Sequence, residues 1–141
     1  CRVTGWPEKY AGHPQGTRAI ELWDNQLPSY FLDTFGRSLR ESPCECGSSG
    51  DPTIAQALHL LNAREIEQKL QAPDGRVTAL SRGSLNNADL VNEISLATFG
   101  RPPNSKELKI GIELLRDKDR RQGIEDFMWV MLNSYDFLFV K

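Results

Sequence analysis

The sequence predicts an all-α fold: a compact helical bundle of about five to seven helices, preceded by an irregular, loop-rich region that contains cysteines. From Thr53 onward, apolar residues recur at the three- and four-residue spacing of a helix face, between stretches that carry capping residues, glycine or proline. Before that point the chain is rich in glycine and proline and shows no regular period. We therefore expect a single domain over 1–141, with an irregular segment at 1–52 and the bundle at 53–141.

The composition is that of an ordinary folded domain. The 141 residues include 17 lysines and arginines against 19 aspartates and glutamates, a net charge of −2, and 39% hydrophobic residues. Nucleic-acid-binding proteins usually carry a large basic excess, so we expect no nucleic-acid partner. No apolar run approaches the ~18 residues that a membrane-spanning helix needs, so we expect no membrane span.

In the first region we expect irregular chain over 1–16 and 18–23. A short helix is predicted from Ser29 to Phe35, because Phe31 and Phe35 share a helix face and Gly36 can end it. A polar loop at 37–52 then contains both internal cysteines.

The bundle is expected to begin after Thr53, with a break near Asn62, where Asn62 and Glu65 have the spacing of a capping box. Helices are then expected to end at the turn of residues 73–75, at Gly83, at Gly100 and near Arg116. Asn104 and Glu107 repeat the capping-box spacing ahead of the helix that ends near Arg116. The apolar residues that we expect to face the core of these helices are Ile54, Ala57, Leu58, Leu61, Ile66, Leu70, Leu90, Val91, Ile94, Ala97, Leu108, Ile112 and Leu115.

The last long helix has the clearest period in the chain and is expected to be the core helix. Ile124, Phe127, Met128 and Met131 share one of its faces. The apolar tail at 135–141 is expected to dock onto the bundle. We interpret the arginines near the start of this helix, Arg116, Arg120 and Arg121, as a solvated helix end rather than an anion site, because aspartates alternate with them.

The cysteines are the residues of this sequence with the clearest potential for a disulfide, a metal site or a reactive thiol. Cys44 and Cys46 lie two residues apart, so in extended chain their Cα atoms are about 6.6–7.2 Å apart, at or beyond the upper edge of disulfide geometry. Candidate disulfide residues are Cys1, Cys44 and Cys46. A zinc site would use Cys44, Cys46 and His59, although their spacing matches no standard zinc module. A metal- or thiol-dependent enzyme centred on these three residues is therefore an alternative to a structural role.

Other chemistry has less support in the sequence. There is no complete catalytic motif, no phosphate loop and no Cys-x-x-Cys-His, so we predict no cofactor and no haem on this chain. The aromatic-rich start offers a second alternative, a carbohydrate-binding module. Its sugar-stacking surface would consist of Trp6, Tyr10, Trp23 and Tyr30.

Several strings of the sequence together resemble one family. They are Gly16-Thr17-Arg18-Ala19, Tyr30-Phe31-Leu32, Phe35-Gly36-Arg37, Cys44-Glu45-Cys46, Gln56-Ala57-Leu58-His59, Phe99-Gly100-Arg101-Pro102-Pro103 with Glu107, and Leu132-Asn133-Ser134 with Phe137-Leu138-Phe139. In this order they are similar to the planctomycete domain of unknown function 1553, and the resemblance spans nearly the whole chain. Members of that family tend to have an arginine shortly after the second cysteine, where this chain has Gly47-Ser48-Ser49.

The resemblance implies a context rather than a reaction. The family forms the C-terminal region of large exported bacterial proteins that also carry cytochrome c-like segments. We therefore expect a C-terminal fragment of an exported protein, periplasmic or on the cell surface, whose partners are other domains of the parent protein or an exported protein, with a glycan as a further candidate. Our leading hypothesis is an uncharacterised helical module with a structural or partner-binding role.

Overall fold

The computed structural model describes residues 2–22, 34, 56, 64–116 and 119–138. The chain divides into two compact units, one made of Cys1–Trp6 with Ala63–Lys141 and the other of Pro7–Asn62. The predicted helical fold is confirmed: the described residues contain helices and no strand. None of these helices has the length and apolar character to cross a membrane.

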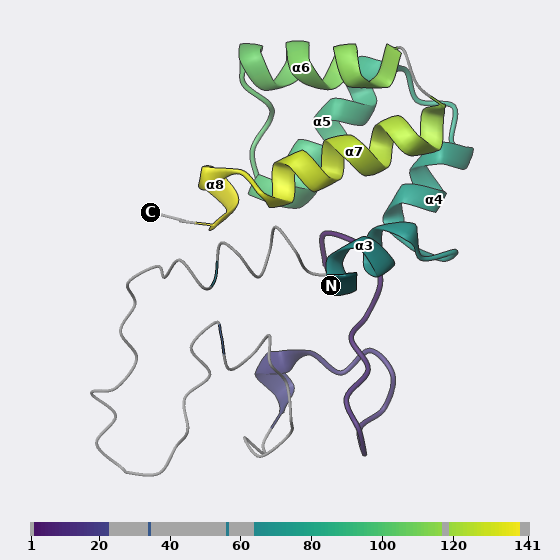
Figure 1. The fold of residues 1–141 in the computed structure, drawn as a ribbon, viewed down its shortest axis with the longest axis vertical. Helices are drawn as coiled ribbons and strands as arrows, with labels where there is room; N and C mark the ends of the chain where they lie inside the picture. The colour runs from purple at the N-terminus through teal and green to yellow at the C-terminus, as the bar shows by residue number, and fades with distance from the viewer. Residues whose placement is uncertain (1, 23–33, 35–55, 57–63, 117–118, 139–141) are drawn as a thin grey trace. The chain divides into compact units, whose positions relative to one another are not determined.

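The helical unit contains α3 (Arg64–Gln71), α4 (Arg76–Arg82), α5 (Asn87–Phe99), α6 (Ser105–Arg116), α7 (Arg120–Leu132) and α8 (Tyr135–Leu138). Figure 1 shows α6 and α7 side by side and running in opposite directions, with α5 behind α7 and α4 at the end where α7 begins. Helix α7 contacts each of the other helices of this unit. The prediction that the last long helix is the core helix is therefore confirmed.

The core of the unit is built largely from the apolar faces that the periodicity predicted, but Ala97, Leu108 and Ile112, which were also expected to face the core, are only half-buried. In α7, Ile124, Phe127, Met128 and Met131 are all buried. They pack with buried residues of the neighbouring helices, which are Ile66 and Leu70 of α3, Val77 of α4, Leu90, Val91 and Ile94 of α5, and Leu115 of α6. Burial of a side chain of this size contributes roughly 1.5–3 kcal/mol, so this face is a major source of the unit's stability.

Two glycines allow α6 to lie close against its neighbours. A Cβ atom at Gly111 of α6 would be 2.5 Å from Cγ2 of Val91 in α5 and 3.0 Å from the ring of Phe127 in α7. A Cβ atom at Gly123 of α7 would be 3.1 Å from the carbonyl oxygen of Leu114 in α6. Larger residues at these points would push the helices apart, because interiors are packed nearly as densely as crystals.

The helix ends follow the predicted stop signals. Gly100 adopts a left-handed conformation (φ 70°) after α5, which favours glycine, and its amide donates to the carbonyl of Leu96. At residues 73–75 the amide of Gly75 donates to the carbonyl of Ala72, which closes the predicted turn before α4. Asp119, expected in a polar hinge, accepts a hydrogen bond from the amide of Arg121 and caps α7.

The other unit is described over 7–22 and at two single residues. A short 3-10 helix, η1 (Ala19–Glu21), lies in the stretch that we expected to be irregular, and at its start the amide and the Nε of Arg18 both donate to the Glu21 carboxylate. Thr34 and Gln56 each have helical backbone, and the side-chain amide of Gln56 donates to the carbonyl of Thr34 at 3.0 Å. The expected boundary at 52/53 and most of the helices predicted at 29–35 and 54–61 lie outside the described residues.

Candidate functional site

Most of the site residues predicted from the sequence lie outside the described part of the chain. The disulfide, zinc and thiol-enzyme hypotheses all depend on such residues and stay predictions. The residues concerned are Cys1, Trp23, Tyr30, Cys44, Cys46 and His59.

Two aromatic residues of the predicted glycan surface are described. Trp6 belongs to the helical unit and Tyr10 to the other unit, and each is half-buried. Burial raises the pKa of the Tyr10 hydroxyl, and the negative charge of Glu8 adds to the increase. A partly covered ring can still offer an edge or a face to a ligand, so the glycan hypothesis also stays a prediction.

A cluster of polar and charged residues centres on Arg101. Its guanidinium donates to both carboxylate oxygens of Glu107, each at 2.9 Å, in the bidentate geometry that suits arginine. The same guanidinium donates to Asp136 at 2.7 Å and lies 4.9 Å from the centre of the Phe99 ring. Arg101 therefore links the end of α5, the first turn of α6 and helix α8.

The residues between α5 and α6 position Arg101 and Glu107. The left-handed Gly100 ends α5, and residues 101–104 lead into α6. The Asn104 side chain accepts from the amides of Lys106 and Glu107, while Glu107 accepts from the amide of Asn104 at 2.7 Å. This is the predicted capping box, and it fixes the Glu107 carboxylate where Arg101 reaches it.

The hydrogen bonds of the cluster favour the charged forms of Glu107 and Arg101. Hydrogen bonds from Arg101, and then from the Asn104 amide, lower the pKa of the Glu107 carboxyl, while partial burial opposes them. Hydrogen bonds to Glu107 and Asp136 raise the pKa of the Arg101 guanidinium. A glutamate with a lowered pKa is ionised at neutral pH and is a poor general acid. The arrangement is suited to holding segments together rather than to moving a proton.

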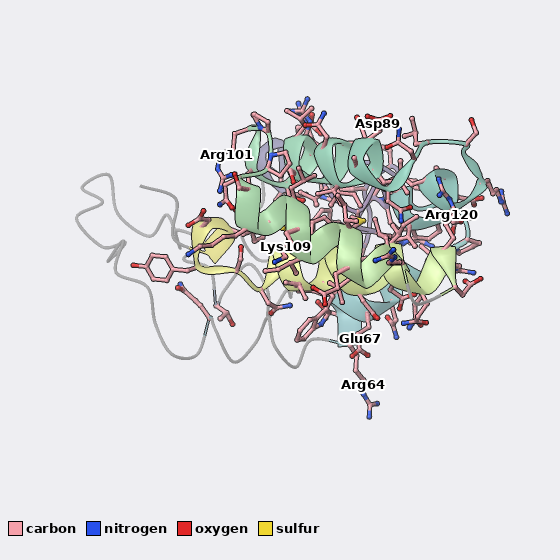
Figure 2. The ribbon with its side chains drawn as sticks, turned by 90° about the horizontal axis from the view of Figure 1, so that it is seen from above. Arg64, Glu67, Asp89, Arg101, Lys109 and Arg120 are labelled. Atoms are coloured by element: carbon pink, nitrogen blue, oxygen red, sulfur yellow. The ribbon has the colours of Figure 1, made fainter. Side chains whose placement is uncertain are left out.

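A second set of arginines holds the start of α7 to other segments. Arg120 donates to the carbonyls of Gly83 and Leu85, at 3.1 and 2.6 Å, and Arg121 donates to the carbonyl of Gln71 at 2.9 Å. These residues, interpreted from the sequence as a solvated helix end, thus bind the backbone that follows α4 and the last turn of α3. Figure 2 shows Arg120 and Arg101 near opposite ends of the helical unit.

Within residues 2–22, 34, 56, 64–116 and 119–138, no three histidine, cysteine, aspartate or glutamate side chains gather as a metal site would require. The carboxylates of the Arg101 cluster are engaged by a guanidinium, which competes with a cation for the same oxygens.

Comparison with known proteins gives no match: no protein-family model, no curated protein and no solved structure is significantly similar to this chain.

The contact between Arg101 and Asp136 was not predicted from the sequence. The two residues are 35 positions apart, and neither periodicity nor capping rules connect them. They lie in or beside the last two strings on which the family resemblance depends, and Asp136 belongs to the apolar tail that was expected to dock onto the bundle.

Proposed function

We propose that this chain is a noncatalytic helical module of an exported multidomain bacterial protein, with a structural or partner-binding role. The observation that carries the proposal is that four of the described arginines form hydrogen bonds with distant segments of the helical unit. Arg76, Arg101, Arg120 and Arg121 each direct donors to carbonyl or carboxylate oxygens of other segments of the same unit.

Such contacts favour a fixed scaffold. A catalytic arginine must keep donors available for substrate charge, whereas the Arg101 guanidinium is engaged by two carboxylates and by the carbonyl of Pro102. A module that supports neighbouring domains or a partner needs a defined shape more than reactive groups. Arg101 holds α8 in place through Asp136 and so contributes to a defined shape.

The exported, multidomain setting is supported by the resemblance to the planctomycete domain of unknown function 1553. Two strings of that resemblance, 99–103 and 132–139, supply or flank the residues of the Arg101 cluster. In the proposed setting, the partners are other domains of the parent protein or another exported protein.

The experiment that tests this proposal is fractionation of the source cells, followed by an immunoblot with an antibody raised against the chain. We expect the signal in the exported or cell-surface fraction, in a polypeptide much larger than the 15.9 kDa of this chain. A cytoplasmic marker protein controls for leakage between fractions. A 15.9 kDa band confined to the cytoplasm would contradict both the exported and the multidomain parts of the proposal.

A further inference from the structure

Residues 2–5 lie along the first turn of α4, where three of their carbonyl groups accept hydrogen bonds from Arg76. The Arg76 amide donates to the carbonyl of Thr4 at 2.7 Å, and its Nε donates to the carbonyl of Val3 at 2.8 Å. The Nη2 atom donates to the carbonyl of Arg2 at 3.3 Å. A single residue therefore binds three consecutive carbonyl groups more than 70 positions away in the sequence.

The contact also meets a local need of α4. The first amides of a helix have no acceptor within the helix, and a side chain at the preceding residue usually supplies one. Asn86, Asn104 and Asp119 do so for α5, α6 and α7. The residue before α4 is Gly75, which has no side chain, and the carbonyl of Thr4 supplies the acceptor instead.

The fit discriminates between residue types at two positions of the bound segment. Thr4 is only 5% exposed, so a larger side chain would not fit there without rearrangement. Gly5 has a left-handed backbone (φ 69°), and a Cβ atom at this position would be 3.0 Å from the amide nitrogen of Arg76. Both the left-handed backbone and the close approach of Arg76 therefore favour glycine at position 5. Arg2 and Val3, by contrast, are bound through backbone carbonyls that every residue has.

The guanidinium is oriented by a further contact. Nη1 of Arg76 pairs with Glu93 of α5 at 3.3 Å, which leaves Nε and Nη2 directed at the carbonyls. Lysine has one ammonium group and no fixed fork of donors, so it could not reproduce this geometry.

We propose that Arg76 is a peptide clamp of the helical unit, whose occupant is this chain's own residues 2–5. The clamp recognises a segment by its backbone, with two variable residues followed by a small buried residue and a left-handed glycine. A separate peptide of the same pattern takes the place of the internal segment when that segment is weakened. The clamp uses an Arg76 contact that also supports the proposed scaffold function, and it goes beyond that function because it recognises a defined segment.

The test measures hydrogen exchange at the Arg76 amide by NMR on the full chain. Gly5→Ala and Arg76→Gln are expected to speed exchange at the backbone amide of position 76 about five- to tenfold relative to its intrinsic rate, the effect of losing roughly one hydrogen bond. Two matched controls are expected to leave it unchanged. Gly12→Ala places alanine at another left-handed glycine (φ 78°) with no atom within 4 Å, and Arg82→Gln removes an exposed arginine from the last turn of α4.

Protection of the Met128 amide, in the centre of α7, verifies that each variant is folded. If Met128 stays protected and Arg76 exchanges at the wild-type rate in Gly5→Ala, the clamp does not hold residues 2–5 and the proposal is wrong. If Gly12→Ala has the same effect as Gly5→Ala, the inference that contact with Arg76 requires glycine at position 5 is also wrong.

The second arm tests recognition of a separate peptide. The acetylated, amidated peptide Arg-Val-Thr-Gly-Trp, at millimolar concentration, is expected to restore slow exchange at the Arg76 amide of the Gly5→Ala chain. The same peptide with L-alanine in place of glycine is expected to have no effect. Equal action by both peptides, or by neither, would overturn the recognition of a separate peptide.

Discussion

The guanidinium of Arg101 reaches the carboxylate of Asp136 at 2.7 Å, across 35 residues of sequence, while it also binds Glu107 through two parallel hydrogen bonds. This contact brings the short helix α8 onto the junction between α5 and α6. Since α8 contributes only four residues, its position depends on contacts made outside the helix itself.

Replacement of Arg101 by glutamine is therefore expected to loosen α8 without unfolding the core. The variant loses the charged partner of Asp136 and the bidentate contact with Glu107. Hydrogen–deuterium exchange followed by mass spectrometry should show faster exchange in a peptide covering 133–138 and unchanged exchange in the centre of α7. Lys109→Gln, which removes one positive charge from the exposed face of α6, is the control. Unchanged exchange at 133–138 in Arg101→Gln would contradict the role assigned to Arg101.

The lowered pKa of Glu107 predicts a pH dependence of stability. A carboxyl whose pKa is lower in the folded state contributes stability above its unfolded pKa, and this contribution is lost as the pH falls through the folded value. Wild type is expected to melt at a higher temperature than Glu107→Gln at neutral pH, and the difference should shrink as the pH falls below 4.5, the ordinary value for this group.

Thermal melts followed by circular dichroism across this pH range check the prediction. Glu113→Gln, on an exposed position of the same helix, removes one carboxylate without touching the Arg101 cluster. If the difference in melting temperature between wild type and Glu107→Gln grew as the pH fell, the result would contradict the stabilising role of the ion pair between Arg101 and Glu107.

The capping box at the start of α6 predicts the effect of substitutions at Asn104. Alanine removes the acceptor of two amide hydrogen bonds and is expected to lower the free energy of unfolding by about 0.5–2 kcal/mol. Serine at the same position keeps an oxygen acceptor and should retain most of the stability. Urea denaturation measures both variants, and equal losses for alanine and serine would argue against side-chain capping.

The close approach of α6 to α5 and α7 predicts that Gly111→Ala is destabilising. The new Cβ would overlap Cγ2 of Val91 and press on the Phe127 ring, at a cost of about 1–3 kcal/mol. In the double variant with Val91→Ala, the overlapping methyl group is absent, so the double variant should lose less stability than the sum of the two single variants. Denaturation of the four proteins in this cycle measures the coupling, and strict additivity would mean that the two residues do not meet.

The sequence predicted the described helices α5, α6 and α7 well because local signals and long-range packing agree there. Ile124, Phe127 and Met131 recur at helical spacing and are all buried, and Gly100 and the Asn104–Glu107 pair mark helix ends through short-range rules. Such features involve residues within one or two turns of each other.

The contacts of the arginines could not be predicted in this way. Arg76 binds carbonyls near the start of the chain, and Arg120 binds carbonyls 35 and 37 residues away. A carbonyl group is common to every residue, so the identity of the acceptor leaves no trace in the sequence. Even at the start of α4, where Gly75 lacks a capping side chain, the sequence does not indicate that Thr4 replaces it.

Native intact-mass spectrometry of the freshly purified chain, with and without a thiol-alkylating reagent, tests the noncatalytic module most directly. We expect the measured mass to be that of the polypeptide without stoichiometric metal. The variants Cys44→Ser, Cys46→Ser and His59→Ala are expected to be metal-free as well. A bound metal that protects the cysteines from alkylation and is lost in these three variants would contradict the account. It would instead support the predicted metal site at Cys44, Cys46 and His59, on which the alternative enzyme hypothesis depends.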